Sequence, residues 1–566
     1  MKDNQDRECL QRHKELRPLL SDYIEHYAKL TPTKTAIIEV NTGETVTYKD
    51  FKTKMDAFAA KLLSMGLKRG DIIATSLPFL KEHVFLQYGA FKIGVVVAPL
   101  DLRLKAREIL YSLKKIKPKA YFFLGKTETV DFRPIISEVK AQAGFVEHWI
   151  QFQKEEDLII DGAVGIKKWA SDIKWLYIMS KLLGTVKRAK KKGSGKDAAL
   201  IIFTTGSTGA PKPALLSNNG ILVQNIGLGV GLGIQPDDRM VVNLPPSHVG
   251  GQTEQLMTTF YMGGTVLLLH IFDPHLTLEA IQKYKATLMG QIPALFNMEW
   301  RLPDYDKFDL SSLRLVLYGG QTVDKPFLEN MRRMAPNIAT GLGLTETSGF
   351  CTYTRLGADV EELTKSIGFD MPLMRISIRE PMDEYGNAGK EKPKGEVGEI
   401  TFSGPQIFLG YLGDDEATAK TISKDGYLYT GDMGYYDTEG LHFAGRSKFV
   451  VKPKGYQVFP AEVEGFITER FKDRVVQTGV VGVPHAVFSE GIVAFVELRK
   501  DAVLTKDEVM TASRDMAAYK RPGHVVFLQE AEMPLNRVAK IDYQALKKMA
   551  LSEIERLRAE HGWDAE

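Results

Sequence analysis

Short apolar, β-branched runs alternate along most of the chain with segments whose apolar residues recur at helical spacing. Near the N-terminus, TAIIEV, DIIATSLP and VVVAPL predict strands, whereas KDFKTKMDAFAAKLLSMG and EHVFLQYGAFKIG predict helices. In the first helical segment the apolar positions share one face, and Gly66 supplies a C-cap. The same alternation returns at 200–203, 239–243, 265–269 and 313–317. This order predicts α/β architecture with mainly parallel sheets.

Residues 154–196 interrupt the alternation. An aromatic, apolar middle is followed there by the basic stretch KRAKKKGSGK. We expect a surface helix and a flexible basic linker, because runs of like charge are usually solvated. The alternative is a basic amphipathic helix that rests on an anionic membrane surface.

The pattern changes again after Arg446, where strands and helices become shorter and charged residues lie between them. This change predicts a large N-terminal domain over 1–447 and a small C-terminal domain over 448–566. No internal repeat of fixed period is present in the sequence.

Composition narrows the class of protein. With 566 residues, 44% apolar and 26% charged, the chain suits a globular protein of about three or four folding units. A net charge of +3 implies no general attraction to nucleic acid. Two cysteines exclude a disulfide framework and a cysteine-based zinc site, and suit a reducing compartment. The polar N-terminus and the lack of a run of ~18 apolar residues predict a cytoplasmic protein without an integral membrane segment.

A candidate phosphate-binding loop follows the apolar strand at 200–203. It reads TTGSTGAPK and comprises Thr204, Thr205, Gly206, Ser207, Thr208, Gly209 and, after Ala-Pro, Lys212. Small residues let backbone amides approach an anion, hydroxyls add donors, and lysine adds positive charge. The spacing differs from a Walker A loop, in which the lysine follows glycine directly.

This loop resembles the signature of the adenylate-forming superfamily, with departures at Pro213 and Asn218. Further segments follow in that superfamily's order: LPPSHVGG at 244–251, YGGQT at 318–322, TGLGLTE at 340–346, YLYTGDMGYYDTEG, GRSKFVVKPKGYQVFPAEVE at 445–464, and PLNRVAKIDYQAL. Such an ordered set over nearly the whole chain is specific. The chain is identified as a member of the acyl-CoA synthetase, or AMP-dependent synthetase and ligase, family. The resemblance implies a large N-terminal domain of several subdomains and a small, mobile α+β C-terminal domain.

The resemblance also implies a reaction. A carboxylic acid and ATP form an acyl-adenylate and pyrophosphate, and coenzyme A then accepts the acyl group, leaving AMP. Mg²⁺ is the implied cofactor, with ATP and coenzyme A as substrates. The implied partners are therefore small molecules, with no nucleic acid; a homodimer is compatible with the resemblance.

The resemblance assigns the nucleotide and metal roles residue by residue. Thr345 donates to the α-phosphate, Glu346 holds Mg²⁺, and Asp432 accepts the ribose hydroxyls. Lys540 bridges the carboxylate and phosphate charges in the first step, although Ala539 precedes it where the family usually has glycine. The remaining nucleotide-binding candidates are Gly319, Gly320, Gln321, Thr340, Gly341 and Arg446, with the loop residues 204–209 and Lys212.

In the second step the family's small domain rotates about a hinge residue, here Lys448. Gly455 and Tyr456 then face the pantetheine arm, and Lys452 and Gln457 match positions that contact the adenylate in coumarate-type ligases.

The acyl pocket is assigned to His248, Val249, Gly250 and Gly251. No aspartate lies between Leu244 and Gly251, as expected for a simple acid rather than an amino acid. Three alternatives remain: an acyl-AMP ligase that loads a carrier protein, an adenylate-binding pseudoenzyme, and a luciferase. No specific feature of the sequence supports the luciferase.

Overall fold

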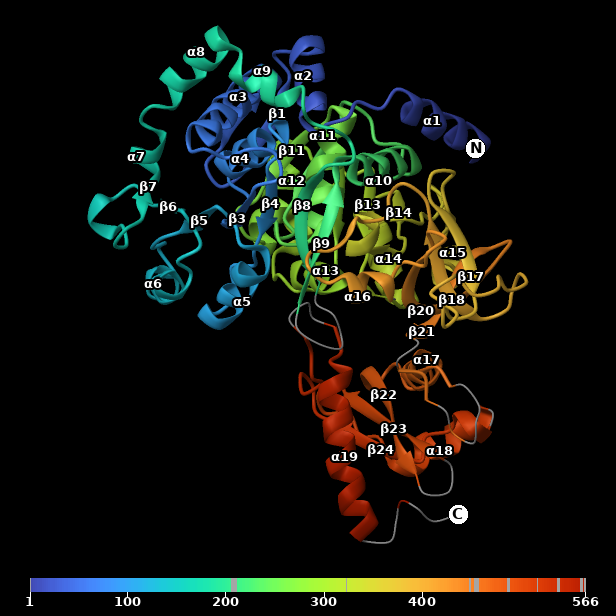
Figure 1. Cartoon of the computed structure of the whole chain (residues 1–566). Helices are drawn as coiled ribbons and strands as arrows, with labels where there is room; N and C mark the ends of the chain where they lie inside the picture. The colour runs from blue at the N-terminus through green and yellow to red at the C-terminus, as the bar shows by residue number, and fades with distance from the viewer. Residues whose placement is uncertain are drawn as a thin grey trace. The chain divides into compact units, whose positions relative to one another are not determined.

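The computed structural model describes residues 2–204, 211–321, 323–446, 449–451, 453, 458–485, 489–516, 518–536, 540–559 and 563, excluding the side chains of residues 2, 3, 446 and 489. The chain forms two compact units. The first comprises Met1–Ile376 and Phe402–Leu428, and the second comprises Ser377–Thr401 and Tyr429–Glu566. Figure 1 shows the elements of both, and each unit is described by itself.

The first unit contains a seven-stranded sheet. All neighbouring strands in it are parallel except β2, which pairs antiparallel with β1 at the edge. Its spatial order is β14 (Asn337–Ala339), β13 (Leu315–Tyr318), β12 (Leu288–Gln291), β10 (Arg239–Val242), β11 (Thr265–Leu268), β1 (Thr35–Glu39) and β2 (Glu44–Thr47).

An eight-stranded sheet is the second layer of the same unit. Its core is parallel, and its end β19-β9-β8 is antiparallel. The order is β19 (Gly410–Tyr411), β9 (Lys212–Ser217), β8 (Ala198–Thr204), β4 (Val96–Pro99), β3 (Ile72–Ser76), β5 (Ala120–Leu124), β6 (His148–Phe152) and β7 (Val164–Gly165).

Helices cover these sheets, and most of them bury apolar side chains against the protein. In α3 the buried residues include Phe51, Met55 and Phe58, and Gly66 has the positive φ of a C-terminal cap. The helices are α1 (Lys2–Lys14), α2 (Ser21–Leu30), α3 (Tyr48–Ser64), α4 (Lys81–Lys92), α5 (Ala106–Ile116), α6 (Arg133–Gln142), α7 (Ile166–Ala170), α8 (Ile173–Leu183), α9 (Thr185–Lys190), α10 (Asn218–Gly231), α11 (Thr258–Met262), α12 (Pro274–Tyr284), α13 (Pro293–Trp300), α14 (Lys325–Met334), α15 (Val360–Lys365) and α16 (Asp415–Ala419).

The second unit holds two smaller sheets. The four-stranded sheet has the order β17 (Arg375–Arg379), β18 (Gly398–Ser403), β20 (Leu428–Asp437) and β21 (Gly440–Arg446), and β17, β18 and β20 each cross a unit boundary. The three-stranded sheet has the order β22 (Val475–His485), β23 (Ser489–Leu498) and β24 (His524–Leu528), accompanied by α17 (Pro460–Arg470), α18 (Lys506–Ala512) and α19 (Tyr543–Ala559).

The predicted α/β class with mainly parallel sheets is confirmed. The predicted boundary at Lys448 lies outside the described residues. Both cysteines are free and buried. Among the helices of the described chain, none is long and apolar enough to cross a bilayer. The basic end of the 154–196 segment is more ordered than expected, since α9 continues to Lys190.

Candidate active site

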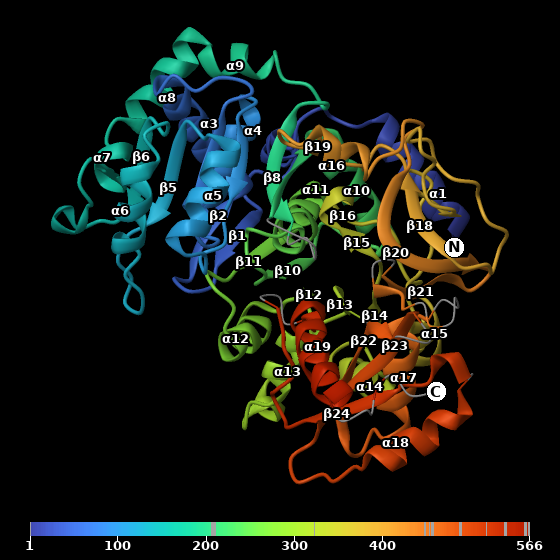
Figure 2. The ribbon, with the colours of Figure 1, turned by 60° about the horizontal axis from the view of Figure 1, so that its bottom comes forward.

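Loops that carry candidate residues follow three parallel strands of the seven-stranded sheet. The segment containing His248 follows β10, Gly319 follows β13, and Thr340 follows β14. Parallel strands end at one edge of a sheet, and that edge is where ligands bind in open α/β folds. Figure 2 shows this end of the first unit, with β10, β12, β13 and β14 side by side. The fold therefore gathers these sequence-distant candidates at one edge.

The turn after β13 is packed too closely to admit side chains. The Gly319 N–H donates to the Gln291 carbonyl at 3.2 Å, and a Cβ on Gly319 would lie 2.8 Å from the Phe350 ring. Gly320 has φ +90°, which glycine adopts without strain. Gln321 is exposed beside this turn. In the segment after β14, a Cβ at Gly341 would collide with the Thr352 carbonyl. Glycine is thus required by the packing at these positions.

Thr345 and Glu346 lie on a short 3₁₀ turn, Thr345–Thr347. The chain then reverses through Ser348, whose φ is +57°. Gln406 holds this turn in place, because its side-chain amide donates to the Thr347 carbonyl at 2.7 Å and to the Phe350 carbonyl at 2.6 Å. The backbone of this candidate phosphate- and metal-binding turn is therefore held by a buried side chain that the sequence alone did not single out.

Three side chains meet beside this turn. The Tyr411 hydroxyl donates to Glu346 Oε1 at 2.6 Å, and the Lys212 ammonium lies 5.1 Å from the centre of the Tyr411 ring. The Phe408 N–H also donates to the Glu346 carbonyl at 2.9 Å. Burial, and then the neighbouring Glu346 carboxylate, hold the pKa of Tyr411 well above its usual value. Tyr411 therefore remains a hydrogen-bond donor at neutral pH, and it connects a carboxylate to a lysine.

The candidate phosphate loop begins where these groups meet. Thr204, at the end of β8, pairs directly with Lys212 at the start of β9. The loop residues Thr205, Gly206, Ser207, Thr208 and Gly209 lie outside the described residues. The two residues that flank the loop, Thr204 and Lys212, are thus held together as one antiparallel pair between β8 and β9.

The residues present fit an oxygen-ligated metal such as Mg²⁺. Glu346 offers a hard carboxylate, and its Oε2 atom makes no hydrogen bond to any described residue. The described part of the chain contains no group of three or more His, Cys, Asp or Glu residues that could hold a metal ion. One protein carboxylate with water and substrate phosphates is a common arrangement for Mg²⁺.

His248 lies at the opening of a π-helical turn, η2 (Gly250–Met257). Its Nε2 atom is 3.8 Å from Asp101 Oδ2, and the Ser247 hydroxyl donates to the same oxygen at 3.3 Å. Burial opposes ionisation of Asp101, but hydrogen bonds from Arg103 and the nearby His248 outweigh it and hold the Asp101 pKa well below its usual range. Asp101 is therefore a negative group close to the candidate gating histidine.

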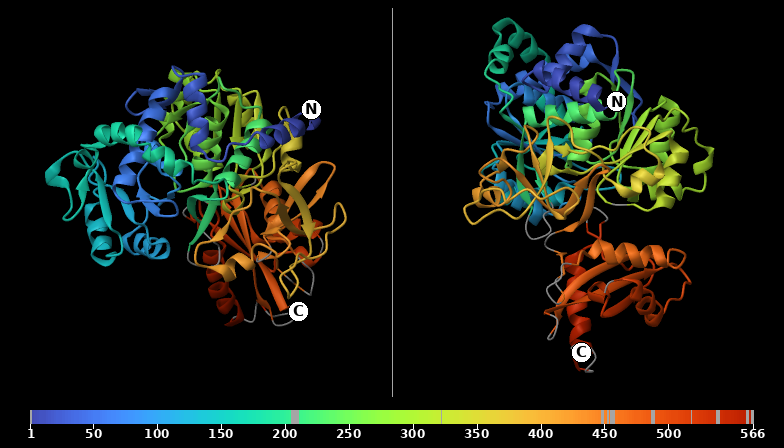
Figure 3. Two further views of the ribbon diagram at one scale, coloured as in Figure 1. Left: turned by 45° about the horizontal axis from the view of Figure 1, so that its top comes forward. Right: turned by 90° about the vertical axis from the view of Figure 1, so that its right-hand side faces the viewer.

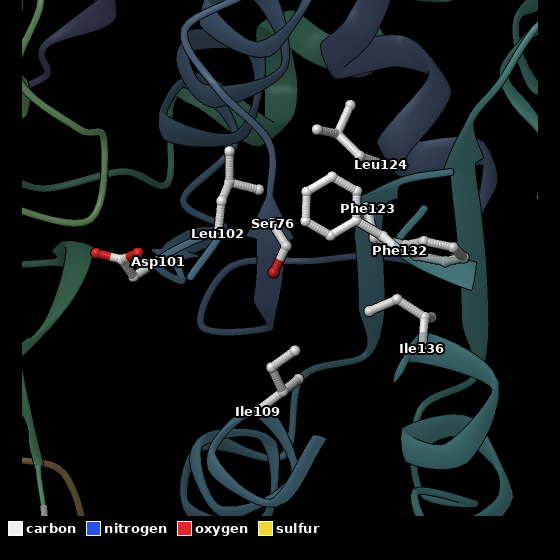
Figure 4. Close-up of a pocket in the computed structure, with 8 residues that line it drawn as sticks. All are labelled: Ser76, Asp101, Leu102, Ile109, Phe123, Leu124, Phe132 and Ile136. Atoms are coloured by element: carbon white, nitrogen blue, oxygen red, sulfur yellow. The ribbon is translucent and has the colours of Figure 1, made fainter. Parts of the chain in front are cut away.

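Asp101 also borders a small hollow, shown in Figure 4, in the eight-stranded sheet. Its carboxylate points away from the aromatic rings. The hollow lies at the ends of β3 and β5 and is lined mainly by apolar side chains: Ser76, Asp101, Leu102, Ile109, Phe123, Leu124, Phe132 and Ile136. Its lining offers little polar chemistry for catalysis.

Glu254 was not predicted, yet it lies on the same π-helical turn as Gly250 and Gly251. The Cβ position of Gly349 is 3.0 Å from Glu254 Oε1, and that of Gly250 is 3.7 Å from Glu254 Oε2. Glu254 is half-buried, and desolvation raises its pKa to about 7 even though the Phe350 N–H donates to it. The sequence feature that could have pointed to Glu254 is that it is the single acidic residue in the segment GGQTEQLMTTF.

Asp432, the ribose candidate, belongs to the second unit. It is 3% exposed on β20 and pairs in register with Arg446 of β21. The preceding Gly431 N–H donates to Glu399 at 2.9 Å. Burial, and then the Asp432 charge, raise the pKa of Glu399 despite that bond. The sequence pattern predicted Asp432 and Arg446 but not Glu399.

Lys540 lies in a tight loop of the second unit. The Lys540 N–H donates to the Asn536 side chain at 3.2 Å, and the Asn536 N–H donates to the Lys540 carbonyl at 2.7 Å. After this loop α19 buries Leu546, Ala550 and Ile554. The hinge and thiol-channel candidates Lys448, Lys452, Gly455, Tyr456 and Gln457 lie outside the described residues.

Comparison with known proteins identifies the family of the chain. Residues 24–412 match the AMP-binding enzyme family, and residues 449–540 match the AMP-binding enzyme C-terminal domain. A luciferin 4-monooxygenase of Photuris pensylvanica is 29% identical, covering 91% of each chain. A 4-coumarate–CoA ligase 4 of Arabidopsis thaliana is 28% identical over 88% of this chain and 85% of the relative.

A solved structure shows the same fold. The ATP-bound MatB of Rhodopseudomonas palustris has a TM-score of 0.75 and 24% identity, covering 93% of this chain and 98% of that chain. The matched domains place the chain among the AMP-binding enzymes, within the adenylate-forming superfamily. The chain belongs to the acyl-CoA synthetase family of that superfamily.

Proposed function

We propose that this protein is an ATP-dependent acid–thiol ligase that forms acyl-CoA through an acyl-adenylate. The acid's carboxylate oxygen attacks the α-phosphorus of ATP, and the bond to pyrophosphate breaks. The coenzyme A sulfur then attacks the acyl carbon and displaces AMP, while the thiol proton passes to solvent. The cluster of Lys212, Tyr411 and Glu346 at the base of the phosphate loop carries this proposal, because it joins phosphate-binding and metal-binding chemistry.

The roles of individual residues follow from charge. Adenylation brings a carboxylate toward a triphosphate, so positive charge and donors must offset the repulsion. Lys212, Thr345 and the loop residues would hold the phosphates, and Lys540 would bridge acid and α-phosphate. Mg²⁺, when bound, neutralises phosphate charge, and Glu346 would supply one oxygen ligand. Asp432 and Arg446 would hold the ribose.

Glu254 supports a class of acid. The Phe350 N–H already donates to the partly buried Glu254 carboxylate, and a further donor near Gly250 or Gly349 would stabilise the charged form more. We propose that the acyl substrate carries a hydroxyl or amino group at a distance from its carboxylate, and that this group donates to Glu254. His248 would lie near the carboxylate end of such an acid, whereas Gly251 packs against the Leu244 and Pro245 carbonyls and leaves no room for a substrate.

A panel of hydroxyl-bearing, amino-bearing and unsubstituted aliphatic and aromatic acids tests the function. Each acid is supplied with ATP, Mg²⁺ and coenzyme A, and pyrophosphate, AMP and thioester are measured. All three products should form in equal amounts with the preferred acid. Pyrophosphate without thioester, followed by acyl transfer to a holo-carrier protein, would instead favour the carrier-loading ligase. ATP binding without pyrophosphate release from any acid would favour the pseudoenzyme.

A further inference from the structure

Helix α8 presents apolar side chains to solvent. Trp175 is 61% exposed, Ile178 47%, Leu182 75% and Leu183 56%. Their spacing places them along one face of the helix. Exposed apolar side chains that adjoin one another on one short helix mark an interaction surface, whereas single ones are ordinary.

The opposite side of α8 packs on the protein. Ser180 is buried and receives hydrogen bonds from the Thr185 hydroxyl at 2.9 Å and the Val186 N–H at 3.3 Å. Figures 1 and 2 show α8 and α9 along the outer side of α3, at the margin of the first unit, and Figure 3 shows the same helices from two further sides. The apolar face therefore looks away from the core that holds the helix.

Positive charge surrounds this face. Nine basic residues and one acid, Asp172, lie between Ile166 and Lys192. The Asp172 carboxylate is paired with Lys61 of α3 at 2.6 Å. Eight of the basic residues are exposed: Lys167, Lys168, Lys174, Lys181, Lys187, Arg188, Lys191 and Lys192.

We propose that α8 is a docking surface for an anionic phospholipid bilayer, with its apolar face in the headgroup region and the surrounding cations on lipid phosphates. Apolar side chains with tryptophan on one face and lysines at its borders are the features that hold a helix in a membrane interface. A second copy of the chain suits the surface less well, because a symmetric contact through α8 would oppose like charges. This inference does not depend on the proposed function.

The test uses the full-length protein with vesicles of phosphatidylcholine alone or mixed with phosphatidylglycerol. Trp175 gives a direct signal, because Trp149, Trp169 and Trp563 are buried and Trp300 is half-buried. We expect co-sedimentation with the anionic vesicles and a blue shift of tryptophan emission, both weakened by high salt. Binding only to neutral vesicles, or to neither, would overturn the proposal.

Two double variants and one control variant identify the surface. The double variant Trp175→Ser/Leu182→Ser should lose anionic-vesicle binding at least ~tenfold, whereas Ile271→Ser, which removes a similarly exposed apolar side chain elsewhere in the unit, should not. Lys181→Gln/Lys187→Gln should bind more weakly at low salt and show a smaller salt dependence. Unchanged vesicle binding by the serine variant would refute the assignment. If the wild type forms a dimer but does not bind vesicles, and the serine variant is monomeric, a second copy of the chain is the occupant.

Discussion

The Tyr411 hydroxyl donates a 2.6 Å hydrogen bond to Glu346 Oε1. This bond connects β19, at the edge of the eight-stranded sheet, to the turn after β15 (Gly343–Leu344). Tyr411 also pairs with Ala214 of β9, two residues from Lys212. One tyrosine therefore fixes the orientation of the metal-binding candidate relative to the phosphate loop.

The first prediction follows from this bond. Glu346→Gln should lower adenylation and raise the Mg²⁺ concentration needed for half-maximal rate, because the charged ligand is lost. Tyr411→Phe should raise the Mg²⁺ requirement less, by about tenfold, since a hydrogen bond to a charged group contributes roughly 1.5–3 kcal/mol. Pyrophosphate release measured against Mg²⁺ concentration checks both. Tyr385→Phe, an exposed tyrosine, is the control. Wild-type Mg²⁺ dependence in Glu346→Gln would remove this residue from the metal site.

The second prediction concerns nucleotide affinity. Asp432→Ala should weaken ATP binding by about tenfold or more, because losing a charged acceptor leaves donors unpaired at a cost of roughly 1–3 kcal/mol. Calorimetry measures the affinity directly. Asp437→Asn alters another acid of the same strand, one that pairs with His442 at 3.0 Å, and should leave ATP binding unchanged. Equal affinities of Asp432→Ala and wild type would exclude the ribose role.

The third prediction concerns acid preference. Wild type should favour a hydroxyl- or amino-bearing acid over its methyl analogue by about tenfold in kcat/KM, and Glu254→Leu should lose or reverse that preference. The pKa near 7 means that the carboxylate form grows as pH rises through that value, so preference for an amino-bearing acid should rise with it. Glu254→Gln should show no such rise. If Glu254→Leu keeps the wild-type order of acids while turning over the methyl analogue, Glu254 does not determine specificity.

The fourth prediction concerns stability and pH. Glu299 is fully buried, accepts a 3.0 Å hydrogen bond from Gln291, and its Oε1 finds no hydrogen-bond partner among the described residues. Burial raises its pKa from 4.5 to about 8. The folded chain thus holds this proton at pH values where the unfolded chain has lost it. The group's contribution to stability is full below pH 4.5 and declines as pH rises toward 8.

Thermal unfolding from acidic to mildly alkaline pH checks this sign. Glu299→Gln should unfold at a higher temperature than wild type at the alkaline end, and its unfolding temperature should fall less with pH. Some decline should remain, because Glu254 also has a raised pKa. Glu329→Gln, an exposed acid on α14, should follow the wild-type curve. Parallel curves for Glu299→Gln and wild type would show that Glu299 is ionised in the fold.

The periodicity of the sequence predicted the α/β class and the positions of α3, α4, β3 and β4, because these elements are set by local apolar spacing. The glycines at 319 and 341 were found by motif, and the structure supplies a physical reason: Phe350 and Thr352 fill the space a side chain would need. Motif spacing also predicted Glu346 and Asp432.

Residues brought into place by tertiary packing were not predicted. Tyr411 reaches Glu346 across 65 positions of sequence, and Gln406 reaches Thr347 across 59. Neither pairing leaves a local pattern. Glu254 was missed because an acid within an apolar helix is usually a surface residue, and only the proximity of Gly349 shows that it faces inward. The exposure of the apolar face of α8 was not predicted for a similar reason. Helical periodicity identifies an apolar face, but it does not show whether that face packs on the protein or meets solvent.

The last prediction separates the two half-reactions. In the proposed mechanism, Lys540 is needed while carboxylate and triphosphate repel each other, and that need ends once the acyl-adenylate exists. Lys540→Ala should therefore abolish pyrophosphate release from acid and ATP, yet still convert supplied acyl-adenylate and coenzyme A to thioester. Gly455→Trp should do the reverse, since a bulky side chain would block the pantetheine passage while adenylation proceeds. Lys506→Ala, a lysine on α18 beside His524, is a matched charge control in the same unit. If folded Lys540→Ala and Gly455→Trp lose both half-reactions equally, one conformation performs both steps and Lys448 is not a hinge between two.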